Sequence, residues 1–265
     1  MIARKSQKIK LLVKIKLSVV IITFNEERNI AACIDAVRDI ADEVLIVDSY
    51  STDQTQFICE SKKARFVYHA FEGYGAQKNW ATAQATHDYI LNLDADEIPD
   101  EQLLSSIKNA KNNWLSDVYV CNRCNNYCGQ WIKHGAWYPD RKMRLYDRRK
   151  GHWTTALVHE TFQSQPNANI SFLLGDLLHY SYQNLAQHRQ QMEKYSTLGA
   201  QEAFAKNKKS NFVKLYINPL WRFVRDYFLR LGFLDGYFGW IIAKNTAHEV
   251  FLKYVKLRQL HKKKQ

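Results

Sequence analysis

Residues 17–22 form a run of mostly apolar, β-branched residues, the pattern of a strand that is buried on both faces. A polar break follows, and apolar residues then recur at helical spacing from Ile30 to Val37. The same order returns along the chain, with further strands expected at 44–47, 66–68 and 89–93 and helices at 54–63 and 75–85. This alternation predicts an α/β fold with a mostly parallel central sheet, right-handed crossovers and flanking helices.

Polar residues stand at the expected carboxyl ends of these strands. Thr23 and Asn25 follow the first strand, Asp48 follows the second, and Asp94 and Asp96 follow the fourth. Because ligands of open parallel sheets bind beyond this edge, these side chains predict a binding site there. The chain has neither G-x-G-x-x-G after the first strand nor G-x-x-x-x-G-K-[ST], so the common dinucleotide and Walker phosphate loops are unsupported.

Three acids occur within four residues in Asp94-Ala95-Asp96-Glu97. Neighbouring carboxylates repel one another unless a cation lies among them. Their hard oxygen atoms suit Mg²⁺ or Mn²⁺, ions that also neutralise phosphate. The motif therefore predicts a metal–diphosphate site at the end of a strand. A solvated acidic turn explains the same residues without any ligand.

The positive charge of this chain of 265 residues is concentrated at its two ends. Residues 1–16 carry a net charge of +6, residues 206–265 carry +11, and residues 17–205 carry −5. With 46% apolar residues the chain is large enough for one substantial core. We therefore expect a basic arm at 1–16, an enzyme domain at 17–205 and a basic helical extension at 206–265.

Targeting and cysteine patterns favour a cytoplasmic enzyme. The apolar run after the Lys-rich start is short and meets Asn25-Glu26-Glu27, so we expect no secretory signal. No stretch reaches the roughly 18 apolar residues that span a bilayer, and five cysteines do not form a paired disulfide framework. Cys121, Cys124 and Cys128 would need a fourth ligand such as His134 to bind zinc; the alternative is small apolar residues on a strand and its turn.

Three motifs in order resemble the family 2 glycosyltransferases. They are Ser18-Val19-Val20-Ile21-Ile22-Thr23-Phe24-Asn25-Glu26-Glu27, Ile46-Val47-Asp48-Ser49-Tyr50-Ser51-Thr52-Asp53 and Leu93-Asp94-Ala95-Asp96-Glu97. Those enzymes invert the anomeric centre and have a GT-A nucleotide-diphospho-sugar transferase fold. Three later stretches are similar to the branch that contains the lipopolysaccharide core β-glucosyltransferases of Gram-negative bacteria. They are Trp137-Tyr138-Pro139-Asp140, Arg144-Leu145-Tyr146 and Val158-His159-Glu160.

The resemblance implies a nucleotide-sugar pocket at the strand ends. Its donor-binding residues are Thr23, Asn25, Glu26, Asp48, Lys78, Asp94 and Asp96. Asp48 would accept a hydrogen bond from the uracil edge, while Asp94 and Asp96 would hold Mg²⁺ or Mn²⁺ against the diphosphate. A solvated helix lysine is the alternative for Lys78. Tyr50 departs from the family, which usually has glycine there, and tyrosine disfavours a turn with positive φ.

The resemblance also implies a carboxylate base in the acceptor half of the site. Inversion needs a group that takes the proton of the attacking hydroxyl. Glu160 matches the family's His-Glu position and is the expected base, with His159 as its neighbour or as a loop histidine. Asp140 is the alternative base.

The C-terminal extension combines apolar and basic residues. Between residues 212 and 231 apolar side chains recur close to helical spacing: Phe212, Leu215, Tyr216, Pro219, Leu220, Phe223, Val224, Tyr227, Phe228 and Leu231. Basic side chains lie among them: Lys214, Arg222, Arg225 and Arg230. A basic, aromatic amphipathic helix suits an anionic membrane surface. The alternatives are a helix packed on the enzyme's own core and a nucleic-acid site, for which the chain has no reading motif.

The sequence and the resemblance together predict an inverting, metal-dependent transferase. It would move a hexose, glucose by resemblance, from a UDP-sugar to a lipid-anchored lipopolysaccharide or lipooligosaccharide core. It would act from the cytoplasm on the inner face of the plasma membrane, without nucleic acid. The alternatives are another lipid-linked glycan or a protein as acceptor, and a catalytically inactive nucleotide-sugar-binding scaffold.

Overall fold

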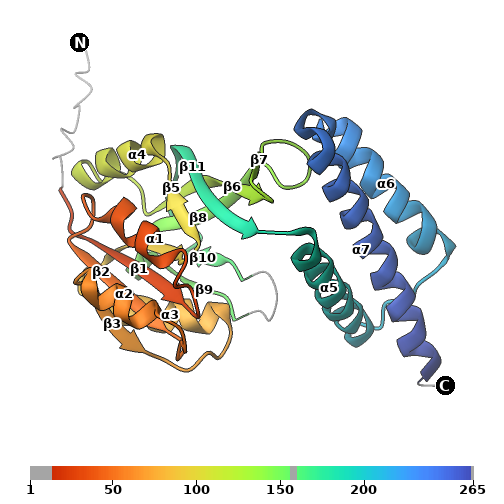
Figure 1. Cartoon of the computed structure of the whole chain (residues 1–265), viewed down its shortest axis with the longest axis horizontal. Coiled ribbons are helices and arrows are strands. Elements are labelled where there is room, and N and C mark those ends of the chain that lie inside the picture. Colours follow the sequence, from red (N-terminus) through yellow and green to blue (C-terminus); the bar gives the residue numbers. More distant parts are fainter. Residues whose placement is uncertain (1–13, 156–159, 264–265) are drawn as a thin grey trace, which may run out of the picture. The chain divides into compact units, whose positions relative to one another are not determined.

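The computed structural model describes residues 14–155 and 160–263 (Figure 1). The chain forms two compact units, each made of two stretches of sequence. The first unit consists of Met1–Cys121 and Met143–Gly175, and the second of Asn122–Lys142 and Asp176–Gln265. The second unit also contains the helical extension predicted at 206–265.

The elements follow the expected alternation at first and then change character. The strands are β1 (Leu17–Thr23), β2 (Glu43–Asp48), β3 (Arg65–Tyr68), β4 (Tyr89–Asp94), β5 (Glu97–Pro99), β6 (Val118–Tyr127), β7 (Gln130–Ile132), β8 (Asp140–Asp147), β9 (Gly151–Trp153), β10 (Phe162–Ser164) and β11 (Ile170–Tyr182). The α-helices are α1 (Ile30–Val37), α2 (Thr55–Ser61), α3 (Tyr74–Gln84), α4 (Glu101–Asn112), α5 (Leu185–Ala205), α6 (Asn218–Val224) and α7 (Gly236–Lys263). Short 3₁₀ turns are η1 (Arg148–Lys150) and η4 (Gly232–Asp235), and π-helical turns are η2 (Val213–Ile217) and η3 (Arg225–Leu229).

The larger sheet has the strand order β3-β2-β1-β4-β8-β6-β11-β5, with β7 paired to β6. The first four strands in this order are parallel, as predicted, and β8 is antiparallel to β4. The register pairs Thr23 with Asp48 and Ile22 with Asp94. The carboxyl ends of β1, β2 and β4 therefore meet at one edge, which confirms the predicted convergence.

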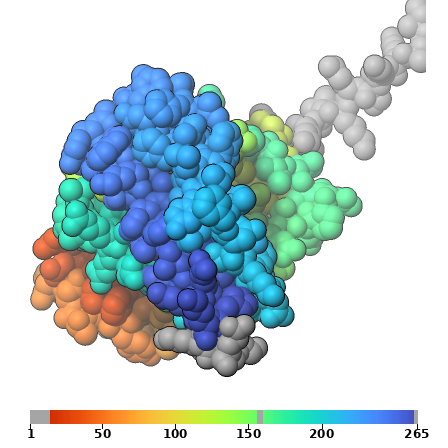
Figure 2. All heavy atoms as spheres, turned by 90° about the vertical axis from the view of Figure 1, so that its right-hand side faces the viewer, coloured from red at the N-terminus to blue at the C-terminus, as the bar shows by residue number. Residues whose placement is uncertain are grey.

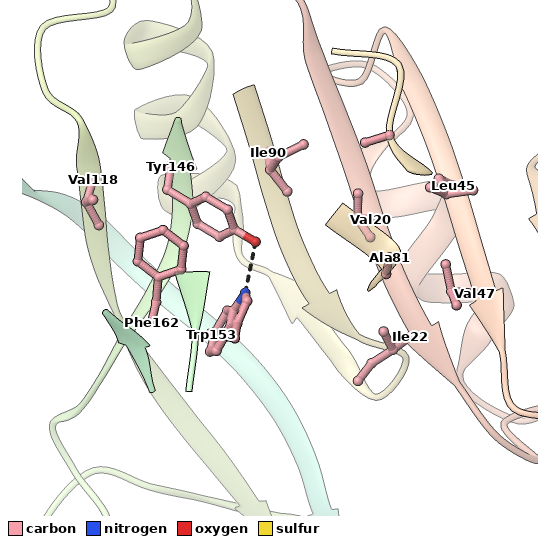
Figure 3. Packing of buried hydrophobic residues seen from close by; sticks show 11 residues of the cluster. Val20, Ile22, Leu45, Val47, Ala81, Ile90, Val118, Tyr146, Trp153 and Phe162 are labelled. Atoms are coloured by element: carbon pink, nitrogen blue, oxygen red, sulfur yellow. Dashed lines mark hydrogen bonds between the residues drawn. The ribbon is translucent and has the colours of Figure 1, made fainter. Parts of the chain in front are cut away.

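The core of the first unit explains the unbroken apolar run that begins the sequence. Every residue of β1 is buried, because layers cover both faces of the strand. On one face Val20, Leu45 and Ile90 pack with Trp153 and other side chains in a single cluster (Figure 3). Each such side chain contributes about 1.5–3 kcal/mol on burial. This core fixes the strand ends that carry the polar residues.

The second unit is built around α7. Both α5 and α6 pack on this helix, which lies between them in Figure 1. Two apolar clusters hold the three helices, one around Tyr127 and Ile242 and one around Ala200 and Leu257. The helical segment expected at 212–231 is present, but π-helical turns interrupt it on either side of α6.

The N-cap residues of α1 and α2, Asn29 and Gln54, make no side-chain capping hydrogen bond. The helix α1 begins at Ile30, so the acids at 26 and 27 precede its first turn. The Ser51 hydroxyl, before α2, donates to Asp48. Within residues 14–155 and 160–263, no helix has the length and apolarity that a bilayer crossing requires.

The cysteines on β6 and its turn follow the apolar interpretation. Cys121 and Cys124 are buried in the strand, and the Cys124 thiol lies 3.5 Å from the Ile132 carbonyl oxygen. His134, the candidate fourth zinc ligand, lies 2.9 Å from an oxygen of Asp235 instead. Among the described residues no three His, Cys, Asp or Glu side chains gather as a metal cluster. The structure thus gives no support to a zinc site.

Candidate functional site

Asp48 ends β2 with its side chain fully buried. Its two carboxylate oxygens accept hydrogen bonds from the backbone N–H and the hydroxyl of Ser51, at 2.7 and 2.5 Å. Acceptance from a backbone N–H two or three residues on is a common way for aspartate to fix a turn. The carboxylate predicted to meet the uracil therefore holds the loop that follows β2.

Asn25 shapes the neighbouring loop from the β1 side. It takes a left-handed conformation, with φ of 54°, which asparagine tolerates better than most residues. The Asn25 side-chain oxygen accepts a hydrogen bond from the backbone N–H of Thr52 at 2.8 Å. The Asn25 backbone N–H donates to the Ser51 hydroxyl at 2.8 Å. The Glu26 carboxylate accepts from the Asn29 side chain at 2.7 Å. These contacts join the β1 and β2 loops into one support.

Two buried polar side chains of this region lack a protein partner. In the described part of the chain, neither the Thr23 hydroxyl nor either amide atom of Asn92 has a hydrogen bond. Both side chains are buried, and Asn92 is on the same face of β4 as Asp94 because strand residues alternate. An unsatisfied buried group costs about 1–3 kcal/mol. Sequence reasoning missed Asn92, whose only signal was an amide inside an apolar strand.

Tyr50 adopts the conformation that its residue type disfavours. Its φ is 64°, in the left-handed region that costs a bulky residue about 1–2 kcal/mol. The ring stacks on Tyr68, with centroids 5.2 Å apart and planes 9° from parallel. Such a pair contributes about 0.5–1.5 kcal/mol. Tyr50 therefore takes the positive φ that glycine adopts without strain, and its ring packs on Tyr68 at the surface of the loop.

Asp94 lies between two buried cations at the end of β4. The Lys78 ammonium is 3.2 Å from one carboxylate oxygen, and the Arg144 guanidinium is 2.7 Å from the other. The side chains of Lys78 and Arg144 are only 1% and 4% exposed. The interpretation of Lys78 as a solvated helix lysine is therefore wrong, and so is a fully solvated acidic turn.

Arg144 contacts two residues of the acidic motif, Asp94 and Glu97. Its guanidinium contacts Glu97 at 2.5 Å, and the other Glu97 oxygen accepts from the Asp94 backbone N–H at 3.1 Å. Burial alone would lower the pKa of Arg144, but the charges of Asp94 and Glu97 raise that pKa above its usual value. Glu97 therefore supports the turn after β4. Arg144 was not expected in the site, and its strand, Asp140–Asp147, carries no local pattern that predicts this pairing.

The Trp153 ring lies against both cations, Lys78 and Arg144. The Lys78 ammonium lies 4.7 Å from its ring centroid, and the Arg144 guanidinium carbon lies 5.8 Å from it. The indole N–H donates to the Tyr146 hydroxyl at 2.9 Å (Figure 3), and the Trp153 backbone bonds twice to the Asn79 side chain at 2.8 Å. A cation over a tryptophan face is stabilised electrostatically.

Glu160 meets the same lysine. Its carboxylate oxygen lies 2.9 Å from the Lys78 ammonium, and its side chain is 20% exposed. The structure thus brings together Lys78, Asp94 and Glu160, three of the residues predicted from sequence. His159 lies outside the described residues. Asp140, the alternative base, contacts Arg123 at 2.8 Å and Lys142 at 3.0 Å within the second unit.

The oxygen atoms of the acidic motif fit a divalent ion whose coordination shell is completed by substrate phosphate. Glu97 is fully buried against Arg144, whereas Asp94 is 25% exposed and Asp96 is half-buried. Mg²⁺ is commonly held by one or two carboxylates together with substrate phosphates, rather than by an all-protein cage. Each carboxylate oxygen of Asp94 has a second lone pair besides the one facing a cation. Asp96 and Asp94 are therefore the residues that would hold such an ion.

Comparison with known proteins agrees with this architecture. The profile of Glycosyl transferase family 2 matches residues 18–166. An uncharacterized glycosyltransferase of Rickettsia typhi is 30% identical over 92% of this chain and 87% of its own length. The lipopolysaccharide core biosynthesis glycosyltransferase LpsC of Rhizobium meliloti is 31% identical over 94% of each chain.

The chain belongs to glycosyl transferase family 2, and its first unit has the GT-A type of nucleotide-sugar transferase fold. Among solved structures, glucosyl-3-phosphoglycerate synthase of Mycobacterium tuberculosis aligns over 42% of this chain and 44% of its own. That alignment has 22% sequence identity and a TM-score of 0.36.

Proposed function

We propose that this protein transfers a hexose, with glucose as the first candidate, from a UDP-sugar to a lipopolysaccharide or lipooligosaccharide core, with inversion. Family membership supports the transferase class, and the likeness to LpsC over nearly the whole chain supports the acceptor class. The observation that carries the proposal is the convergence of Lys78, Asp94 and Glu160 at the strand ends. In this arrangement Lys78 would attract the diphosphate, Asp94 would bind the metal ion, and Glu160 would accept the proton of the acceptor hydroxyl.

The donor side of the site is assigned to the two strand-end loops and the acidic motif. Thr23, Asn25 and Asp48 shape the pocket for the base and ribose, and Glu26 supports it. Asp96 and Asp94 would hold Mg²⁺ or Mn²⁺, which would offset the charge that develops on the leaving diphosphate. Lys78 adds a buried positive charge beside them, where low polarity strengthens its attraction to phosphate.

Glu160 is assigned the proton transfer. The acceptor hydroxyl oxygen bonds to the anomeric carbon while the bond from that carbon to the diphosphate breaks. The electron pair leaves with UDP, and the hydroxyl proton passes to Glu160. The ion pair with Lys78 fixes the orientation of Glu160 in the protein without substrates. Lys78 therefore positions the base and also faces the diphosphate side.

The activity is tested by incubating the protein with a panel of UDP- and GDP-sugars, with Mg²⁺ or Mn²⁺, and measuring free nucleoside diphosphate. The proposal expects UDP release, stimulated by a core saccharide acceptor. A preference for a polyprenol-linked glycan or a protein would replace the acceptor assignment. No release with any donor, together with tight UDP binding, would identify a scaffold that has lost catalysis.

We also propose that the protein acts at the anionic inner face of the plasma membrane, where a lipid-anchored core would be presented. The second unit exposes many large apolar side chains, here called the C-terminal apolar face: Phe212, Val213, Tyr216, Ile217, Leu220, Trp221, Phe228, Leu229, Leu231, Phe233, Leu234, Tyr237 and Trp240. Exposed apolar patches of this kind mark interaction sites. The helical segment at 212–231 is therefore only partly packed on the protein's own core.

The basic residues of this segment divide into two groups. Arg222 and Arg225 both contact the buried carboxylate of Asp226, Arg225 at 2.9 Å, so their charge is largely used within the fold. Lys214 and Arg230 remain for anionic lipid, with Lys262 and the Lys-rich residues before 14, which lie outside the described chain. The protein should sediment with phosphatidylglycerol vesicles at low salt and dissociate at high salt, because salt screens surface charge. Failure to bind such vesicles at low salt would contradict this location.

A further inference from the structure

A groove runs along α7 between α5 and α6, entirely within the second unit. Its volume is about 720 Å³, within the range of small-molecule sites. The apolar side chains that line it include Met192, Leu215, Pro219, Phe223, Ala247 and Phe251. They come from all three helices and from the π-helical turn η2. The groove is therefore a built feature of this helical arrangement and lies outside the nucleotide-sugar site.

Positive charge lines the same groove. Arg189 comes from α5 and Lys244 from α7. Within residues 14–155 and 160–263, neither Arg189 nor Lys244 forms an ion pair, and Lys244 lies 5.0 Å from the Trp240 ring centroid. The one acid of the lining, Glu193, is paired with Lys256 at 2.5 Å. An apolar groove that also carries basic groups without a partner acid has the chemistry to bind an anionic amphiphile.

The groove is continuous with the C-terminal apolar face. Tyr216 and Leu220 line the groove and are also 52% and 61% exposed. Figure 2 views the molecule from the side that carries the blue C-terminal helices. A molecule held in a membrane at this face would reach the groove without crossing a polar barrier.

We propose that this groove binds one acyl chain of an anionic phospholipid, with the headgroup phosphate at Arg189 and Lys244. The chain lies against Met192, Phe223 and Phe251. The inference rests on the membrane location proposed above and deepens it, since it assigns a specific lipid site rather than general surface attraction. The bound lipid would hold the second unit at the bilayer that carries the acceptor.

The site is tested with the full-length protein and phosphatidylglycerol that carries a photoreactive group in one acyl chain, in phosphatidylcholine vesicles. Mass spectrometry should map labels to α5, α6 and α7 around Met192, Phe223 and Phe251. Ala247→Trp fills the groove and should remove these labels while vesicle sedimentation remains. Labels confined to residues 228–240, or groove labels unchanged by Ala247→Trp, would overturn the proposal.

Charge variants separate the groove from the rest of the basic surface. Arg189→Glu with Lys244→Glu should weaken phosphatidylglycerol labelling by more than about fivefold per charge, the factor for loss of one lipid-facing cation. Arg258→Glu with Lys209→Glu changes the net charge equally at exposed positions outside the lining and should leave groove labelling intact. Equal losses in both pairs would contradict a specific site. Circular dichroism checks that each variant is folded.

Monomeric lysophosphatidylglycerol distinguishes failure of the groove from failure of the membrane proposal. Native mass spectrometry should detect one bound lysolipid in the wild type and none in Ala247→Trp. If this holds but intact vesicles are ignored, the groove stands and the membrane location fails. If vesicles bind but the lysolipid does not bind the wild type, the location stands and the groove assignment fails.

Discussion

The Lys78 ammonium lies 2.9 Å from the Glu160 carboxylate, although the two residues are 82 positions apart in the chain. The same ammonium is 3.2 Å from Asp94, so one buried cation joins the proposed base to the proposed metal site. Trp153 beneath it limits the positions that the lysine can take. In the proposed function this contact aligns the two halves of the reaction before either substrate binds.

Loss of Asp96 should affect the reaction and spare the fold. Asp96→Asn should lower the transfer rate at least about 10²-fold, the usual scale for removing stabilisation of a leaving group. Its melting temperature should match that of the wild type, and the exposed Asp39→Asn should behave as wild type in both measurements. Mn²⁺ binding in the presence of UDP, followed by electron paramagnetic resonance, should weaken in parallel. Full activity in excess chelator would refute the metal assignment.

Arg144→Met should destabilise the first unit strongly. It leaves Glu97 buried without its cation, and breaking one side of a buried pair costs about 3–5 kcal/mol. Urea unfolding measures this loss. Lys62→Met removes the cation of a surface pair whose carboxylate, Asp35, is 58% exposed, and should cost no more than about 1 kcal/mol. Adding Glu97→Gln to Arg144→Met should recover part of the loss; no recovery would show that Arg144 acts through other contacts.

Asp48→Ala should weaken UDP binding. A lost hydrogen bond to a charged group is worth about 1.5–3 kcal/mol, or roughly 10- to 100-fold in affinity. Titration calorimetry with UDP measures it, and Ser51→Ala separates the two roles of Asp48 because it loosens the loop but keeps the carboxylate. Wild-type affinity in Asp48→Ala would contradict the placement of the base. An equal loss in both variants would assign Asp48 to the loop alone.

The early part of the fold was predictable because its signals are local. The run at 17–22 is apolar without alternation, as a strand covered on both faces must be, and β1 is fully buried. The order of strands and helices up to β4 followed from the same reasoning. The resemblance added the fold type and the roles expected of Lys78 and Glu160. Both residues lie in the site, and their catalytic roles stay predictions.

Other features depend on contacts between distant residues, which periodicity cannot show. Arg144 and Asp94 form an ion pair although they are 50 positions apart in the chain, and no local sequence pattern near either residue predicts this contact. The same limit applies to the second unit, where α7 packs against helices on more than one side and so has no single apolar stripe. The basic pattern at 212–231 was also ambiguous, since the pairing of Arg222 with Asp226 is a property of the folded helix.

Buried His188 should make stability depend on pH. Burial lowers its pKa to about 4 from 6.5, and the titratable groups that face it, Tyr127 and Tyr182, have raised pKa values and stay neutral. Between pH 6.5 and 4 the unfolded chain binds the proton and the folded chain does not, so stability falls as the pH is lowered. The loss should be about 2 kcal/mol from pH 7 to pH 5.

Urea unfolding of the wild type and His188→Gln at several pH values tests this expectation. Other carboxylates titrate in both proteins, so the difference between the two curves isolates His188. The variant should lose less stability on acidification, and the two curves should converge toward low pH. Parallel curves would show that His188 is not the titrating group.

The most direct test of the proposed reaction compares the wild type with Glu160→Gln on a UDP-sugar and a core saccharide acceptor. Released UDP and glycosylated acceptor are measured in the same reaction. The wild type should form them in a one-to-one ratio, with inverted anomeric configuration. Glu160→Gln should bind UDP with unchanged affinity and yet fail to transfer, while Asp140→Asn should remain active. Wild-type turnover in Glu160→Gln, with loss of transfer in Asp140→Asn, would contradict the account and assign the proton transfer to the other carboxylate.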